Sequence, residues 1–146
     1  MKTAAQIVKS KLDQTVHAMG PTASAYEAVR LMADKNIGAL LVVERDNVVG
    51  IVSERDYARR IVLMERSPKD TLLSAIMSSP VLYVNPDQTS EECMALMTEN
   101  RLRHLPVMDR GRLIGLISIG DLVKATISEQ RFTIEQLEHY ISGQLD

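Results

Sequence analysis

The sequence has a single cysteine, no tryptophan and only 3% aromatic residues. One cysteine excludes a disulfide framework, and Cys93 falls on the expected packed face of a helix, which favours a small core residue over a nucleophile or ligand. The formal net charge is −2. Few rings and no basic excess argue against nucleic acid and against a membrane surface as partners.

Long apolar runs and recognisable catalytic motifs are also missing. The opening residues 1–8 are too polar for a secretory signal, so we expect a cytoplasmic protein that crosses no membrane. The three histidines (His17, His104 and His139) are scattered, and no metal-ligand spacing, Walker loop or Rossmann glycine loop occurs. We therefore expect no catalytic residues, no metal site and no enzyme activity.

The sequence contains an internal repeat of two copies. A shift of 65 positions, from Gly50 to Gly115, superposes two stretches without a gap, from about Val16 and Val81 onward. The identical pairs are Pro21/Pro86, Glu27/Glu92, Leu31/Leu96, Met32/Met97, Leu40/Leu105, Val42/Val107, Arg45/Arg110, Gly50/Gly115, Ser53/Ser118 and Asp56/Asp121. Neither copy can bury its apolar face well alone, so we expect the two to fold together.

Periodicity predicts the same elements in both copies. In the first we expect an extended segment at 15–17, a helix capped by Ser24, strands at 39–43 and 48–52, and a helix to about Leu63. In the second we expect strands at 79–84, 105–108 and 113–117, a helix at 90–99 capped by Thr89, and a helix at 119–127. Each copy therefore reads β-α-β-β-α, and the fold class is α/β (α+β).

Short helical segments flank the repeats, at 3–11 and 71–77, and an amphipathic segment at 132–141 follows them. That last segment either covers its own core or meets a second subunit. The predicted boundaries are an N-terminal helix at 1–12, repeats at 13–65 and 78–129, and a C-terminal helix at 130–146.

A Ser-x-x-Asp motif follows the last strand of each repeat, at Ser53/Asp56 and Ser118/Asp121. A carboxylate in the first turn of a helix can accept hydrogen bonds from two vicinal hydroxyls, and a nearby Ser and free helix N–H groups can hold an oxyanion. The simpler interpretation is that the serines only cap and the aspartates only complement the helix dipole. Repetition favours a nucleotide-binding role.

The copies differ at Arg103-His104, where the first has Gly38-Ala39. An Arg fork and a His donor suit a phosphate. The competing interpretation is a solvated Arg103 and a neutral, hydrogen-bonded His104. The asymmetry predicts two unequal sites.

These motifs together resemble a tandem pair of cystathionine-β-synthase (CBS) domains, or Bateman module. The residues that carry the resemblance are Val49–Tyr57, Arg103–Val107 and Leu113–Leu122. It implies two pseudo-symmetric repeats packed through their sheets, a homodimer, and adenosine ligands (AMP, ADP, ATP, NAD(H) or S-adenosylmethionine) in clefts between the repeats.

The resemblance also implies the residues of each cleft. In the first, Asp56 holds the ribose, and Ser53, Arg103 and His104 hold phosphate. That cleft comprises Ser53, Arg55, Asp56, Pro80, Val81, Tyr83, Arg103, His104 and Pro106. In the second, Asp121 holds the ribose and Ser118 the phosphate, without an Arg-His pair. That cleft comprises Thr15, Val16, His17, Gly38, Ala39, Ser118, Gly120 and Asp121.

The resemblance implies a regulatory function, and with no effector domain in view we expect a stand-alone sensor that signals energy or redox state to a separate protein. A ligand-free dimeric scaffold that recruits a partner through 132–141 is the alternative. An adenylate-hydrolysing enzyme ranks last, because no base or metal set is visible.

Overall fold

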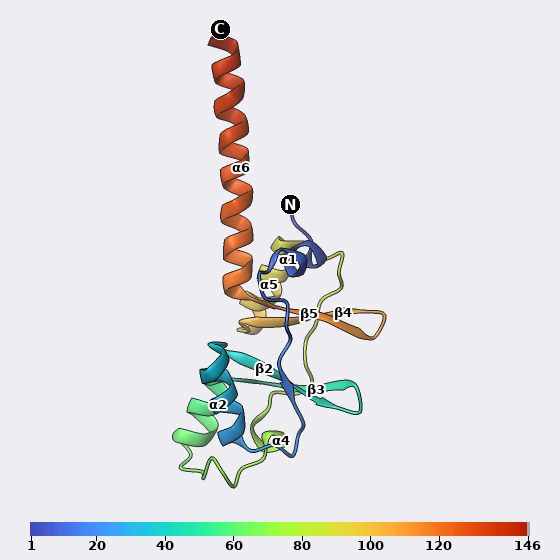
Figure 1. Cartoon of the computed structure of the whole chain (residues 1–146), viewed down its shortest axis with the longest axis vertical. Coiled ribbons are helices and arrows are strands. Elements are labelled where there is room, and N and C mark those ends of the chain that lie inside the picture. Colours follow the sequence, from blue (N-terminus) through green and yellow to red (C-terminus); the bar gives the residue numbers. More distant parts are fainter. Residues whose placement is uncertain (146) are drawn as a thin grey trace. The chain divides into compact units, whose positions relative to one another are not determined.

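The computed structural model describes residues 1–145 (Figure 1). Asp146, the last residue of the predicted C-terminal helix, lies outside the described residues. The chain divides into two compact units. The first-repeat unit is Thr15–Val81, and the second-repeat unit joins Met1–Gln14 to the part of the chain from Leu82 onward. The α/β class and the two repeats are confirmed.

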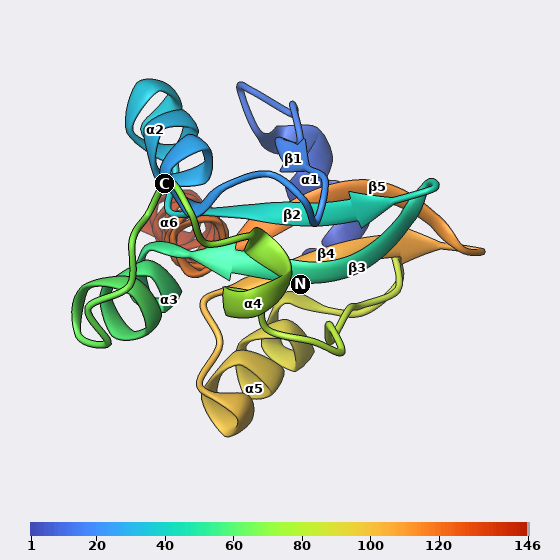
Figure 2. The same cartoon turned by 90° about the horizontal axis from the view of Figure 1, so that it is seen from below.

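The first-repeat unit contains a sheet with the order β1-β2-β3, in which β1 is parallel to β2 and β2 is antiparallel to β3. Figure 2 shows these strands from below, with α4 lying across β3. The elements are β1 (Ala18–Met19), α2 (Ala25–Lys35), β2 (Ala39–Glu44), β3 (Asn47–Ser53), α3 (Glu54–Tyr57), the π-helical η1 (Ala58–Val62) and α4 (Leu73–Ile76).

The second-repeat unit is built around the antiparallel pair β4-β5, with α5 and α6 packed on each other. Its elements are α1 (Ala4–Ser10), α5 (Ser90–Asn100), β4 (His104–Asp109), β5 (Arg112–Ser118) and α6 (Ile119–Leu145).

Local sequence sets the ends of the long helices. Ser24 Oγ accepts a hydrogen bond from the Glu27 N–H at 3.1 Å, and Thr89 caps α5 in the same way. α2 ends at Asn36, whose φ of 53° lies in the left-handed region that Asn tolerates better than most residues. The predicted caps of both helices are confirmed.

Four predicted segments differ from the structure. The first extended segment forms its strand at Ala18–Met19 rather than 15–17, although the His17 carbonyl accepts a bond from Leu41 N–H at 3.1 Å. No strand forms over 79–84: only Val84 bridges to Val107, and Pro80 lacks the N–H that a ladder needs. The segments 119–127 and 132–141 form one helix, because the residues between them contain no Gly or Pro.

Each sheet is covered by a short helix from outside its own repeat. In the second-repeat unit, α1 lies on β5, where a Cβ added at Gly115 would meet the Val8 methyls at 2.6 and 2.7 Å. In the first-repeat unit, α4 lies on β3, where a Cβ at Gly50 would collide with the flexible Met77 side chain. The repeated glycine therefore allows a helix to approach the sheet closely.

Candidate functional site

The Ser-x-x-Asp motifs form the same capping box in both units. The Asp56 N–H donates to Ser53 Oγ at 3.2 Å, and the Ser53 N–H donates to Asp56 Oδ2 at 2.9 Å. In the second-repeat unit the corresponding distances are 3.1 Å, from Asp121 N to Ser118 Oγ, and 2.8 Å, from Ser118 N to Asp121 Oδ2. Capping is therefore a real role of all four residues, and it occupies one oxygen of each carboxylate.

The second carboxylate oxygen is the one that a ligand could use. Among the residues that the structure describes, Asp56 Oδ1 accepts a long bond, from Ser78 Oγ at 3.4 Å. Asp121 Oδ1 has no hydrogen-bond partner among the described residues, because Ser118 and Lys11 both approach Oδ2. Each helix start thus keeps acceptor capacity beyond its cap.

The start of a strand lies beside each motif. Ala39 pairs with Ser53, and the Gly38 carbonyl accepts from the Glu54 N–H at 3.0 Å. His104 pairs with Ser118 in the second-repeat unit, where the Arg103 carbonyl accepts from the Ile119 N–H at 2.9 Å. The structure therefore brings Arg103 and His104 next to the Ser-x-x-Asp motif of their own repeat.

The two expected clefts each draw on both units. From the first cleft, Ser53, Arg55, Asp56, Pro80 and Val81 lie in the first-repeat unit, and Tyr83, Arg103, His104 and Pro106 lie in the second. From the second cleft, Thr15, Val16, His17, Gly38 and Ala39 lie in the first-repeat unit, and Ser118, Gly120 and Asp121 lie in the second. The assignment of these residues to two clefts stays a prediction.

Tyr83 and Gly120, one from each expected cleft, both lie at accessible positions. Tyr83 is 59% exposed and directly precedes Val84, whose N–H donates to the Pro106 carbonyl at 2.9 Å. Gly120 lies in the first turn of α6, and a Cβ there would meet only Ser118 Oγ, at 3.5 Å. A methyl group at position 120 would therefore make only ordinary contact with Ser118.

Lys11 is a site residue that the sequence reasoning missed. Its Nζ lies 3.1 Å from Asp121 Oδ2 and donates to the Leu116 carbonyl at 2.8 Å. In the first-repeat unit the matching carbonyl, Ile51, accepts from the Ser78 N–H at 2.9 Å. The ammonium of Lys11 thus takes the place of Ser78, so a cation adjoins one aspartate and a neutral hydroxyl adjoins the other.

The pKa values of two groups follow from this arrangement. Burial by itself raises the pKa of Asp121, but the Ser118 N–H and the Lys11 ammonium outweigh it, so the pKa lies below its ordinary value. Burial lowers the pKa of His104, with Lys11 and Arg103 adding to the decrease and Asp121 opposing it. At neutral pH the site holds an ionised Asp121 and a neutral His104.

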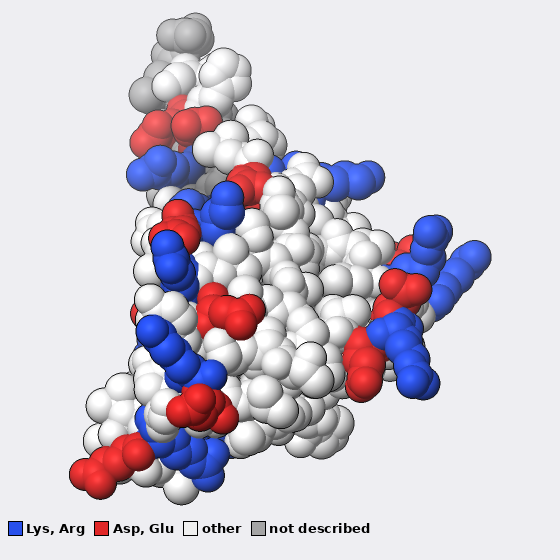
Figure 3. Space-filling model, turned by 60° about the horizontal axis from the view of Figure 1, so that its bottom comes forward, with Lys and Arg blue, Asp and Glu red and all other residues white. Residues whose placement is uncertain are grey.

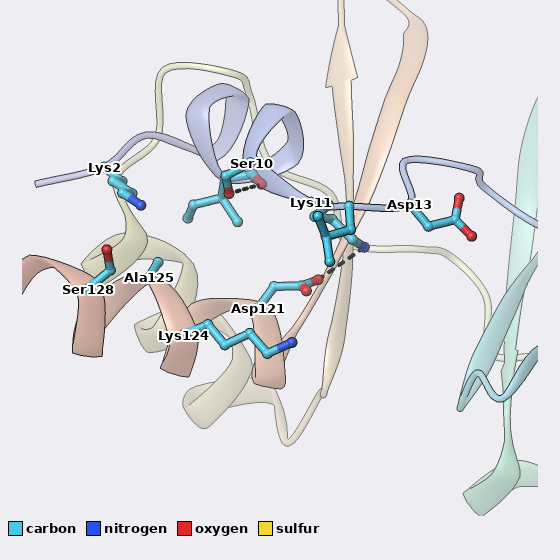
Figure 4. A pocket seen from close by; sticks show the side chains of 10 residues that line it. Lys2, Ser10, Lys11, Asp13, Asp121, Lys124, Ala125 and Ser128 are labelled. Atoms are coloured by element: carbon cyan, nitrogen blue, oxygen red, sulfur yellow. Dashed lines mark hydrogen bonds and ion pairs between the residues drawn. The ribbon is translucent and has the colours of Figure 1, made fainter.

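A pocket of about 460 Å³ opens between α1 and α6, next to Asp121 (Figure 4). Figure 4 shows Lys11 reaching Asp121 from one side, while Lys124 extends along α6 below it. Lys2 and Ser128 lie at the far end. Three lysines and two aspartates therefore line this groove within the second-repeat unit, and Lys11 and Asp121 form an ion pair there.

The face of the molecule drawn in Figure 3 has no large patch of a single charge. In Figure 3, Lys and Arg side chains lie beside Asp and Glu side chains rather than in a field of one sign. Within residues 1–145, no helix is long and apolar enough to cross a membrane, and no group of three or more His, Cys, Asp or Glu side chains could hold a metal ion. The carboxylates at the two helix starts are the chemically distinctive feature.

Replacing Lys11 with methionine should lower the free energy of unfolding by about 1–2 kcal/mol, because Leu116 and the half-buried Asp121 each lose a charged donor. The pKa of Asp121 should rise in the same variant. Urea denaturation and an NMR titration of the carboxyl group measure these changes. Lys9→Met, at an exposed position of the same helix, is the control. Equal stability of the two variants would contradict the arrangement.

His104 should make stability depend on pH. Its folded-state pKa lies below the unfolded value of about 6.5, so its contribution is fully present above that pH and is lost as the pH falls below it. Denaturant unfolding between neutral and mildly acidic pH should show a steeper loss for the wild type than for His104→Gln. Parallel curves for the two proteins would contradict the assignment of a neutral, buried imidazole.

The fold and the site define a class: a tandem-repeat α/β module in which the last strand of each repeat is followed by a serine cap and a helix with an aspartate in its first turn. Residues 11–63 and 73–128 match the CBS domain family. The chain therefore belongs to the CBS-domain family.

Known relatives agree with this assignment. The chain is 41% identical over 125 residues to the mitochondrial CBS domain-containing protein CBSX3 of Arabidopsis thaliana, covering 82% of this chain but only 61% of that protein. It is 32% identical to YhcV of Bacillus subtilis, covering 84% of this chain and 87% of YhcV.

Solved structures are similar as well. A CBS-domain protein of Burkholderia ambifaria MC40-6 is 57% identical with a TM-score of 0.85, covering 88% of this chain and 96% of that one. The CBS-domain protein ATU1752 of Agrobacterium tumefaciens is 33% identical with a TM-score of 0.80, covering 86% and 99%. CBS-domain proteins are in general regulatory modules that often bind adenosine ligands.

Proposed function

We propose that this chain is a sensor that binds an adenine nucleotide (AMP, ADP, ATP or NAD(H)) and signals energy or redox state to a separate protein. The observation that carries the proposal is the repeated carboxylate. In each repeat a serine cap fixes an aspartate at a helix start and leaves one of its oxygens with a long bond, as at Asp56, or with none among the described residues, as at Asp121. That geometry suits two vicinal hydroxyls of a ribose.

Phosphate recognition in the proposal falls to the cationic groups of the second-repeat unit. Arg103 offers a planar fork, and His104 gains a proton most readily when an anion is near, because a negative charge raises its pKa. Lys11 adds a cation beside Asp121 that the sequence alone did not supply. The two aspartates thus have unequal surroundings: in the proposal Arg103 and His104 serve the phosphate of the Asp56 cleft, and Lys11 is the cation beside Asp121.

A second copy and a regulated protein are the proposed macromolecular partners. The hexameric CBS-CP12 protein of bloom-forming cyanobacteria is 30% identical to this chain, with a TM-score of 0.74 and 83% of this chain covered. The Burkholderia ambifaria relative carries a provisional assignment to signal transduction. The first supports an assembly of several copies, and the second supports a role in signalling. In the proposal the nucleotide acts by shifting an equilibrium between states that it binds differently.

Mass spectrometry of small molecules that copurify with the protein tests the proposal most simply. We expect an adenine nucleotide, and adding that compound to stripped protein at 100 times its dissociation constant should stabilise the fold by about 2.7 kcal/mol. Hydrolysis of ATP by the purified protein would point instead to an enzyme.

A ligand-free scaffold is the second candidate, and one observation favours it. Large apolar side chains of α6, including Leu137 and Ile141, are more than half exposed. The two functions separate in one variant that combines Asp56→Ala with Asp121→Ala. A scaffold keeps its partner binding in this variant, whereas a sensor loses its response to nucleotide.

A further inference from the structure

The C-terminal half of α6 has no packing partner within the second-repeat unit. Leu122 and Ala125 are buried in the core of that unit, and Glu129 still accepts a bond from the Lys2 backbone N–H at 2.6 Å. Residues 130–143 are all exposed, and Figure 1 shows this part of the helix extending away from α1 and α5. A single helix of this length without packing partners is only marginally stable in water.

One face of this part of α6 carries a regular row of large apolar residues. The row, which we call the isoleucine seam, consists of Ile127, Ile134, Leu137 and Ile141, with exposures of 43, 53, 57 and 56%. The three isoleucines are seven residues apart and Leu137 lies between two of them. This is a heptad pattern with Ile at every a position and with Gln130 and Leu137 at the two d positions, which is typical of a helix that pairs with another helix.

Phe132 does not belong to the seam. At about 100° per residue it lies roughly 160° around the helix from Ile134, on the opposite face, although it is 63% exposed. Phe132 is instead a matched control for the seam.

Charges beside the seam indicate what covers it. Arg131 and Glu138 occupy the two e positions, and neither has an ion-pair partner among the residues that the structure describes. In a parallel pair, e faces g of the second helix, and g holds Thr126, Thr133 and Tyr140, which carry no charge. In an antiparallel pair, e faces e, so Arg131 of each copy meets Glu138 of the other.

We propose that α6 pairs antiparallel with α6 of a second copy of this chain through the isoleucine seam. Ile134 of one copy lies opposite Leu137 of the other, and two Arg131–Glu138 pairs flank this centre. The remainder of each second-repeat unit then lies at opposite ends of the helix pair, which avoids a clash. The pairing does not depend on nucleotide binding, so the two proposals can fail separately.

Sedimentation equilibrium of the full chain without nucleotide, over a wide range of protein concentration, tests the seam. We expect a dimer for the wild type and a dissociation constant raised about tenfold or more by Leu137→Glu, which places a charge in the centre of the contact. Phe132→Glu should leave the dimer unchanged. A monomeric wild type, an undisturbed dimer in Leu137→Glu, or equal disruption by Phe132→Glu would overturn the proposal.

Charge reversal tests the orientation. Arg131→Glu should weaken the dimer, because it places a second carboxylate opposite Glu138, and adding Glu138→Arg should restore it. These positions are exposed, so circular dichroism should show an intact fold in every variant. A double variant no tighter than Arg131→Glu alone would overturn the antiparallel arrangement.

Discussion

Binding of an adenine nucleotide should weaken about 10- to 100-fold when Asp56 or Asp121 is replaced by asparagine at the site that uses it. A carboxylate that accepts bonds from two ribose hydroxyls contributes about 1.5–3 kcal/mol, and each 1.4 kcal/mol is a factor of ten in affinity. Asparagine keeps the size of the side chain and an oxygen for the cap. Fluorescence or calorimetric titration measures the affinity.

The ligand can be varied in the same experiment to show that the carboxylate contacts the ribose. Wild-type protein should bind 2′-deoxy-AMP more weakly than AMP, and the asparagine variants should lose this discrimination. Glu54→Gln, at an exposed carboxylate in the first turn of α3, is the control and should keep it. A variant that still distinguishes the two ligands as the wild type does would place the ribose elsewhere.

Gly115→Ala should lower the free energy of unfolding by about 1–3 kcal/mol. The new methyl group would lie 2.6 Å from Val8 Cγ1 and 2.7 Å from Cγ2, and both α1 and β5 are held by backbone bonds, so neither can move freely. Gly50→Ala should cost less, because the neighbouring Met77 side chain can bend away. Urea denaturation at fixed pH measures both changes.

A double variant shows whether the contact with Val8 is the cause. Val8→Ala alone should destabilise the protein by leaving a cavity, but combined with Gly115→Ala it should recover part of the loss, because the new methyl occupies the space vacated. Strictly additive losses would mean that α1 does not press on β5 at this glycine.

Most of the fold was predictable because its signals are local. The repeat, the caps at Ser24 and Thr89, and the strand pairs follow from periodicity and capping chemistry. Which helix covers which sheet is not a local property, because α1 and β5 are more than 100 residues apart in the sequence, so no periodic signal predicts that contact.

The site was predictable only in part. The Ser-x-x-Asp motifs are adjacent in sequence, and the structure confirms them as capping boxes. Lys11 could not be assigned, because its contact with Asp121 joins the residue after α1 to the first turn of α6, and the residue that makes the matching contacts in the first-repeat unit, Ser78, is of a different type. Lys11 donates to the Leu116 carbonyl where the first-repeat unit has a backbone hydrogen bond, and it also pairs with Asp121. Contacts between residues so far apart in the sequence leave no periodic pattern.

Isothermal titration calorimetry of the wild-type protein with AMP, ADP, ATP and NADH tests the central claim most directly. The account predicts saturable heat with at least one of them, and loss of that heat when Asp56→Asn and Asp121→Asn are combined in a variant with an unchanged fold. The absence of heat and of any shift in melting temperature with all four ligands, in wild type and variant alike, would contradict it.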